Sequence, residues 1–168
     1  MEGTKSSLFF WKKMITKEQV QDLIKEKLKE KNCFVVELEV RGGSNILLEI
    51  DNYKGLTVED CVSFSRAIEH NLDRENEDFE LNVSSPGLDK PLRVKEQYIK
   101  NIGRNVKVVQ LDGESCIGKL INVEKDEITV EYLCKEIVEG KKKKQIIIKQ
   151  EIINFNNIKE TTIIISFK

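Results

Sequence analysis

The chain has 168 residues, of which 39% are hydrophobic and 34% are charged, so it can form one domain or two small ones with packed cores. No apolar run approaches the roughly 20 residues of a membrane-spanning helix, which excludes that class of protein. The net charge of −1 is unevenly shared, because residues 14–90 carry −7 and residues 91–168 carry +4. This asymmetry predicts different partners for the two parts.

The cysteines and the single histidine argue against a metal centre. Cys33, Cys61, Cys116 and Cys134 form no CxxC pair, and His70 is the only histidine. A structural zinc site needs closely spaced ligand pairs, so buried, reduced thiols in a cytoplasmic protein are expected instead. No GxxxxGK[ST] or GxGxxG phosphate loop occurs, and we expect neither a metal nor a cofactor.

The first helix is predicted from its cap. Residues 1–13 are interpreted as a disordered N-terminal extension, because a cleaner pattern opens at Met14. Thr16, with Gln19 three residues later, resembles a capping box. Apolar residues then recur at helical spacing and predict a helix over residues 17–31.

Two alternating segments around Gly42-Gly43 predict a β-hairpin. The apolar face of its first strand is expected to consist of Val36, Leu38 and Val40. The opposite face of the sheet, uncovered by helices, is expected to be strongly acidic and to carry Glu37, Glu39, Glu49 and Glu80.

A second helix is predicted after Thr57, a candidate N-cap with Asp60 three residues later. Its buried side is expected to consist of Val58, Cys61, Val62, Ile68 and Leu72. Alternation over residues 79–83 predicts a third strand. The order αββαβ is typical of a two-layer α+β domain with both helices on one side, and we assign it to residues 14–85.

The sequence changes character after residue 93. A short helix is predicted over residues 95–102, and every later element has the pattern of a strand. Five short strands with turns at intervals of about 8–12 residues favour a small barrel of SH3-like or OB-like type, over residues 94–168.

Between the two domains lies the segment FELNVSSPGLDKPLR, which raises the question of a serine nucleophile. A nucleophilic serine needs a base within hydrogen-bonding reach, and His70 is the only histidine that could serve Ser84 or Ser85. No GxSxG motif surrounds either serine. A hydrolase is therefore the weakest hypothesis, and the serines are expected to end a strand.

The prolines favour a structural role for this segment. Pro86-Gly87 suits the central positions of a type II turn, with the glycine at positive φ. Leu88 is expected to fill a gap between layers, and Pro91 favours an extended Lys90. Two prolines within six residues predict a stiff joint over residues 86–93.

The most basic segment of the chain is a run of four lysines, Lys141, Lys142, Lys143 and Lys144. Four lysines in a predicted turn could contact the phosphates of a nucleic acid. A solvated loop tip is an equally good interpretation, because charge runs commonly serve only solubility.

The segment Val83–Leu92 resembles the signature V-S-S-P-G-L-D-[RK]-P-L of the RimP family of ribosome maturation factors. The resemblance continues in Tyr98–Val108 and Asn157–Ile165. The residues after Val83 that match the signature are Ser84, Ser85, Pro86, Gly87, Leu88, Asp89, Lys90, Pro91 and Leu92.

The resemblance implies an N-terminal α/β domain, a C-terminal SH3-like (Sm-like) barrel and a cytoplasmic, non-enzymatic assembly factor for the small (30S) ribosomal subunit. In this family the C-terminal domain is associated with a basic ribosomal protein, and the N-terminal domain approaches ribosomal RNA. The acidity of residues 14–90 would better suit a basic protein partner. The alternative is a general RNA-binding module acting through the barrel and Lys141–Lys144, with no link to ribosomes.

Overall fold

The computed structural model describes residues 14–72 and 78–165. The chain divides into two compact units, Met1–Pro86 (the N-terminal unit) and Gly87–Lys168 (the C-terminal unit). The extension predicted over residues 1–13 lies outside the described residues. Among the helices of the described ranges, none is long and apolar enough to cross a bilayer.

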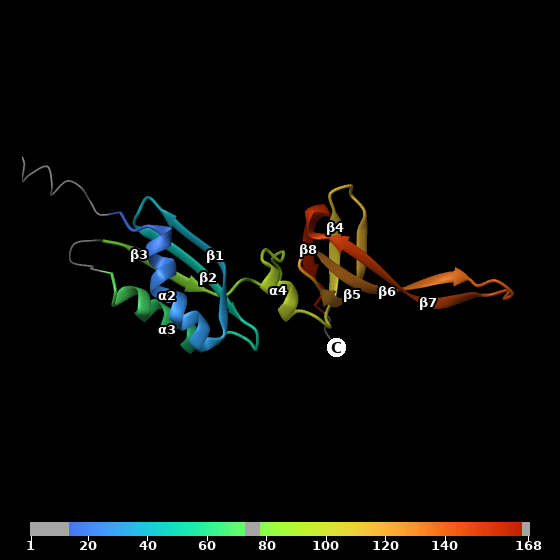
Figure 1. Ribbon diagram of the computed structural model, residues 1–168, viewed down its shortest axis with the longest axis horizontal. Coiled ribbons are helices and arrows are strands. Elements are labelled where there is room, and N and C mark those ends of the chain that lie inside the picture. Colours follow the sequence, from blue (N-terminus) through green and yellow to red (C-terminus); the bar gives the residue numbers. More distant parts are fainter. Residues whose placement is uncertain (1–13, 73–77, 166–168) are drawn as a thin grey trace, which may run out of the picture. The chain divides into compact units, whose positions relative to one another are not determined.

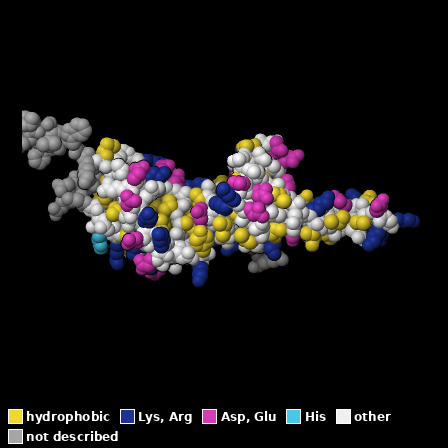
Figure 2. All heavy atoms as spheres, viewed as in Figure 1, with side chains coloured by type: hydrophobic (Ala, Val, Ile, Leu, Met, Phe, Trp, Pro, Cys, Tyr) yellow, Lys and Arg dark blue, Asp and Glu magenta, His cyan; other side chains and the backbone are white. Residues whose placement is uncertain are grey.

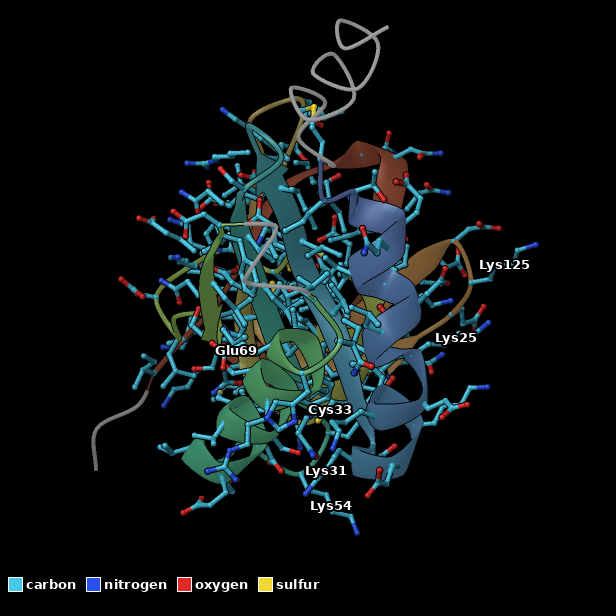
Figure 3. All side chains as sticks on the ribbon, turned by 90° about the vertical axis from the view of Figure 1, so that its left-hand side faces the viewer. Lys25, Lys31, Cys33, Lys54, Glu69 and Lys125 are labelled. Carbon is cyan, nitrogen blue, oxygen red and sulfur yellow. The ribbon has the colours of Figure 1, made fainter. Side chains whose placement is uncertain are left out.

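The N-terminal unit has the predicted αββαβ order. Strand β1 pairs antiparallel with β2, and β2 pairs parallel with β3, giving the sheet order β1-β2-β3. Helices α2 and α3 cover one face of this sheet (Figures 1 and 3). The elements are α2 (Lys17–Lys31), β1 (Cys33–Arg41), β2 (Asn45–Asn52), α3 (Val58–Glu69) and β3 (Glu80–Ser84).

Local signals set the limits of α2, which are those predicted. The hydroxyl of Thr16 accepts a hydrogen bond from the backbone N–H of Gln19 at 3.2 Å. Asn32 ends the helix in the left-handed conformation, with φ of 57°, which asparagine tolerates better than most residues. Val20 and Ile24 are fully buried and attach the helix to the sheet.

The predicted hairpin is confirmed, but one strand face was wrong. Gly42 and Gly43 have φ of 61° and 70°, as a tight turn between twisted strands requires. The pairing of β1 with β2 shifts register between Val35 and Glu37. This bulge changes which side chains share a face of the strand. Val36 is buried, as expected, but Val35 instead of Val36 packs on the helix-side core with Leu38 and Val40.

The buried face predicted for α3 was also partly wrong. Phe64, Ile68 and Leu72 are buried, whereas Val58 and Val62 are 76% and 41% exposed. Positions 64, 68 and 72 recur every four residues and form one narrow apolar stripe. Because the large Phe64 ring lies on that stripe, it turns the side with Val58 and Val62 away from the sheet.

Removing the cap of α3 is expected to lower the stability of the N-terminal unit. The Thr57 hydroxyl accepts from the Asp60 N–H, and the Asp60 carboxylate accepts from the Thr57 N–H, both at 3.1 Å. Thr57→Ala should reduce the free energy of unfolding by about 1 kcal/mol, as for other N-caps. Urea unfolding followed by circular dichroism measures this, with Thr57→Ser as the control that keeps the hydroxyl.

The same cap gives a pH dependence of defined sign. The hydrogen bond from the Thr57 backbone lowers the pKa of the Asp60 carboxyl below its usual value. The stabilisation is therefore present above the ordinary carboxyl pKa and is lost as the pH falls through the lower, folded-state value. The difference in the free energy of unfolding between wild type and Asp60→Ala, which removes the carboxylate but keeps the Thr57 hydroxyl, should shrink in acid. A difference that stays constant with pH would show that the carboxylate takes no part in the cap.

The C-terminal unit contains one short helix and a five-stranded antiparallel sheet in the order β7-β6-β5-β4-β8. This confirms the α+β class, but the described ladders include no pairing between β7 and β8, so closure into a barrel is not detected. The elements are α4 (Lys95–Lys100), β4 (Asn105–Gln110), β5 (Ser115–Val123), β6 (Glu127–Ile137), β7 (Lys144–Asn154), the 3₁₀ turn η1 (Phe155–Asn157) and β8 (Ile158–Ile163).

The core of this unit joins α4 to the sheet. Tyr98 of α4 packs with Val106, Leu120 and Ile128, and its ring meets Phe155 edge-on at 5.2 Å. Its hydroxyl donates to the side-chain oxygen of Thr161 at 2.9 Å. Burial raises the pKa of Tyr98, so this hydroxyl stays protonated and keeps its role as a donor.

Candidate functional site

The signature segment begins inside the core of the N-terminal unit. Val83 packs against the helix-side cluster, and Ser84 is the last residue of β3, where it pairs with Glu49 of β2. The strand-ending position predicted for Ser84 is therefore confirmed.

The other end of the signature is held by the C-terminal unit. The N–H of Leu92 donates to the carbonyl of Thr161 in β8 at 2.8 Å, and Leu92 packs on the C-terminal core. The side-chain oxygen of Gln97 accepts from the backbone N–H groups of Arg93 and Val94 at 2.6 and 3.1 Å. These contacts fix the backbone as it enters α4.

The middle of the signature does not form the predicted turn. The N–H of Lys90 donates to the carbonyl of Gly87 at 3.2 Å, so Leu88 and Asp89 are the two central residues of the turn that forms instead. Gly87 is not in the left-handed region; an added Cβ would instead lie 2.7 Å from the Asp89 carboxylate. Leu88 is 62% exposed, and the expectation that it fills a gap between layers was wrong.

The residues considered for catalysis are not connected by hydrogen bonds. His70 is the C-cap of α3 and lines a groove beside Lys27 and Ser63, which are joined by a hydrogen bond of 2.9 Å. In the ranges that the structure describes, no hydrogen bond links the imidazole to Ser84 or Ser85. The hypothesis of a serine nucleophile activated by His70 therefore has no support in the described ranges.

The lysine run lies at the tip of the hairpin formed by β6 and β7, as the predicted turn requires. Gly140 turns the chain at φ of 87°, and the N–H of Lys141 donates to the carbonyl of Val138 at 3.1 Å. Lys142 and Lys143 follow in the connection between the strands, and Lys144 is the first residue of β7. All four lysines are exposed, so their charges are open to solvent, but contact with ribosomal RNA stays a prediction.

Apolar side chains follow the same hairpin below its basic tip. Figure 2 shows yellow side chains along this projecting part of the C-terminal unit and dark blue ones at its end. The exposed apolar residues of β6 and β7 are Leu133, Ile137, Ile146, Ile148 and Ile152.

This apolar stripe was missed by the sequence interpretation. Leu133 lies directly opposite Ile148, and Lys135 opposite Ile146, so the stripe follows one face of a two-stranded ribbon. On the other face Lys149 pairs with Glu136. The alternation of apolar and polar residues within each strand can be read from the sequence. Only the register of β6 with β7 shows that the apolar residues of the two strands lie on the same face.

The acidic sheet face predicted for the N-terminal unit exists, with one difference. Glu37 lies directly opposite Glu49 across β1 and β2, and like charges at such positions repel each other. Glu49 is only 6% exposed. Contrary to the expectation, its side chain is therefore not open to solvent. Asp51, two residues further along β2, lies on the same face and was not predicted.

The two buried thiols, those of Cys33 and Cys116, have an environment that suppresses their reactivity. Burial raises the pKa of Cys33, which is labelled in Figure 3, and it raises the pKa of Cys116 to about 11. The Cys33 sulfur accepts a hydrogen bond from the Asn52 side-chain amide at 3.4 Å. A thiol with so high a pKa contains little nucleophilic thiolate at neutral pH. The described residues contain no group of three or more His, Cys, Asp or Glu side chains that could hold a metal ion.

Comparison with known proteins identifies relatives along most of the chain. Residues 21–89 match the RimP N-terminal domain. The ribosome maturation factor RimP of Flavobacterium psychrophilum is 36% identical over 155 residues, which is 92% of this chain and all of that protein. The RimP of Christiangramia forsetii is 34% identical over 90% of this chain and 99% of its own length. The RimP of Porphyromonas gingivalis is 36% identical over 79% and 87%, respectively.

These similarities span both units, including the signature and the C-terminal sheet. Identity above 30% over nearly the full length of two relatives is far more specific than the ten-residue signature. The chain therefore belongs to the RimP family of ribosome maturation factors.

Proposed function

We propose that this protein assists maturation of the small (30S) ribosomal subunit in the cytoplasm, by binding the immature particle without catalysing a reaction. The observation that carries the proposal is the match to two ribosome maturation factors over all or nearly all of their length.

We further propose that residues 86–93 form a stiff joint between a domain of residues 14–85 and a domain of residues 94–168. Val83 is held in one core and Leu92 in the other. The chain between them is short, contains both prolines and includes the hydrogen-bonded turn from Gly87 to Lys90. A stiff link of fixed length raises the effective concentration of the second surface once the first is bound.

The charges suggest what each surface contacts. The acidic face of the β1–β3 sheet, with Glu37, Glu39 and the exposed Glu80, suits a basic ribosomal protein. The four exposed lysines of the β6–β7 tip suit ribosomal RNA phosphates, and they are Lys141, Lys142, Lys143 and Lys144. Both assignments are part of the proposal.

Co-sedimentation with immature small subunits tests the proposed function. The full chain is mixed with a bacterial lysate and fractionated on sucrose gradients at low and moderate salt. Selective recovery with small-subunit precursors that persists at moderate salt is expected. Recovery of all RNA classes alike, lost with slight salt, would contradict the proposal and favour the general RNA-binding module.

Loosening the joint is expected to weaken subunit binding. Replacing Pro86 and Pro91 with glycine should reduce affinity for precursor subunits roughly tenfold, because a flexible link lowers the effective concentration. Gradient titration measures the affinity. Ser85→Ala, at an exposed position in the same segment, is the control. If the double variant co-sediments as well as wild type, the joint has no such role.

A further inference from the structure

A groove in the C-terminal unit brings together four cations from separate parts of the chain. Its volume is about 360 Å³. Arg93 comes from the end of the signature, Lys95 from the start of α4, Lys125 from the loop between β5 and β6, and Lys159 from β8. The side chain of Lys125 projects from its loop in Figure 3. No sequence motif brings these positions together.

The lysines of this groove are available for a partner. Lys95, Lys125 and Lys159 are exposed, and within the described residues none of the three makes a salt bridge. Lys31 and Lys149, in contrast, are paired with Asp60 and Glu136. Glu160 is the only carboxylate that lines the groove, so the lining has three more positive than negative charges.

The floor of the groove argues against an apolar protein partner. It consists of Tyr98, which is buried, and of Leu92, Phe155 and Ile158, which are half-buried. Protein interfaces are usually centred on exposed apolar or aromatic anchors, and such anchors lie elsewhere, on the β6–β7 hairpin. A groove with exposed lysines at its rim and no exposed apolar anchor fits a polyanion.

We propose that this groove, the Arg93–Lys159 groove, binds the phosphate backbone of RNA without reading its bases. The proposal deepens the proposed function and rests on it, since the RNA would be that of the immature subunit. Lysine is a point charge that binds phosphate without the geometric selectivity of a bidentate contact. The groove would therefore position the C-terminal unit along an RNA strand.

Fluorescence anisotropy with the full chain and a labelled 20-nucleotide RNA tests the proposal. The variant Lys95→Ala, Lys125→Ala, Lys159→Ala should bind about tenfold or more weakly. Each phosphate contact contributes roughly −0.7 to the slope of log affinity against log salt for single strands, so the slope should flatten by about 2.

A second triple variant removes the same charge elsewhere on the sheet. Lys107, Lys119 and Lys135 are exposed residues of β4, β5 and β6, and their replacement by alanine should change affinity little. Equal weakening by both triple variants would mean that only the overall charge matters, and would overturn the proposal. Absence of RNA binding by the wild type would do the same.

Competition and co-sedimentation separate the remaining outcomes. If polyglutamate displaces the RNA at equal charge concentration, the groove fits an acidic protein, and the proposal is wrong. If the wild type co-sediments with precursor subunits but the two triple variants bind RNA equally, the groove fails while the proposed function stands. If only the groove variant binds RNA more weakly, but the wild type does not co-sediment with precursor subunits, the RNA-binding role of the groove is supported and the proposed function is wrong.

Discussion

Replacing Phe64 with alanine is expected to lower the free energy of unfolding of the N-terminal unit by about 3–5 kcal/mol, the usual range for a buried phenylalanine. The ring is fully buried and belongs to the same cluster as Ile24, Leu48 and Ile68. Its removal leaves a cavity between α3 and the sheet that the surrounding side chains fill only in part. Domains are commonly stable by only about 5–15 kcal/mol, so much of the unit's stability would be lost.

Hydrogen exchange with mass spectrometry on the full chain measures this loss separately in the two units. Protection should fall across α2, α3 and β1–β3, whereas β4–β8 should keep theirs, because the two cores share no residue. Val58→Ala is the matched control on the same helix: Val58 is 76% exposed, and surface changes usually stay within about 0.5 kcal/mol. Equal loss of protection in both units would contradict independent cores.

The elements that the sequence predicted well are those with local signals. The α2 helix begins after Thr16 because a hydroxyl caps its first turn, and the β1–β2 turn lies at Gly42-Gly43 because both residues need positive φ. Caps and tight turns depend on a few adjacent residues. Their positions therefore follow from the sequence without knowledge of the tertiary structure.

The errors occurred where a distant partner decides the outcome. The bulge near Val36 depends on the pairing of β1 with β2, and the side on which α3 is buried depends on where Phe64 meets the sheet. At Pro86-Gly87 the composition suited a type II turn, but the hydrogen bond forms between Lys90 and Gly87. Proline and glycine favour a turn without fixing which four residues form it.

The candidate sites also divide into one that a local signal predicts and others that depend on residues distant in the sequence. Lys141–Lys144 could be named from the sequence because the four charges are contiguous. The Arg93–Lys159 groove could not, since its cations are separated by up to 66 positions in the numbering and meet only through the fold of the C-terminal unit. Likewise, the apolar stripe of the β6–β7 hairpin depends on cross-strand register.

Gly118 illustrates a position where tertiary contact allows a single residue type. It lies in β5, and a Cβ added there would overlap the backbone carbonyl oxygen of Glu131 in β6 and lie 2.9 Å from a methyl group of Val130. The backbone of β6 cannot yield without breaking its pairing with β5. Glycine inside a strand often marks such a close approach of another backbone.

Gly118→Val is therefore expected to destabilise the C-terminal unit by about 3 kcal/mol, the upper part of the range for overpacking, and Gly118→Ala by less. Thermal unfolding should show a lower midpoint, and hydrogen exchange should place the loss in β4–β8 while α2 and α3 stay protected. Lys119→Val introduces the same side chain one residue later, at an exposed position, and should be nearly neutral. Because the clash in Gly118→Val is with backbone, enlarging the space by Val130→Ala should restore little stability; full recovery would show that the side chain, and not the Glu131 carbonyl, is the obstacle.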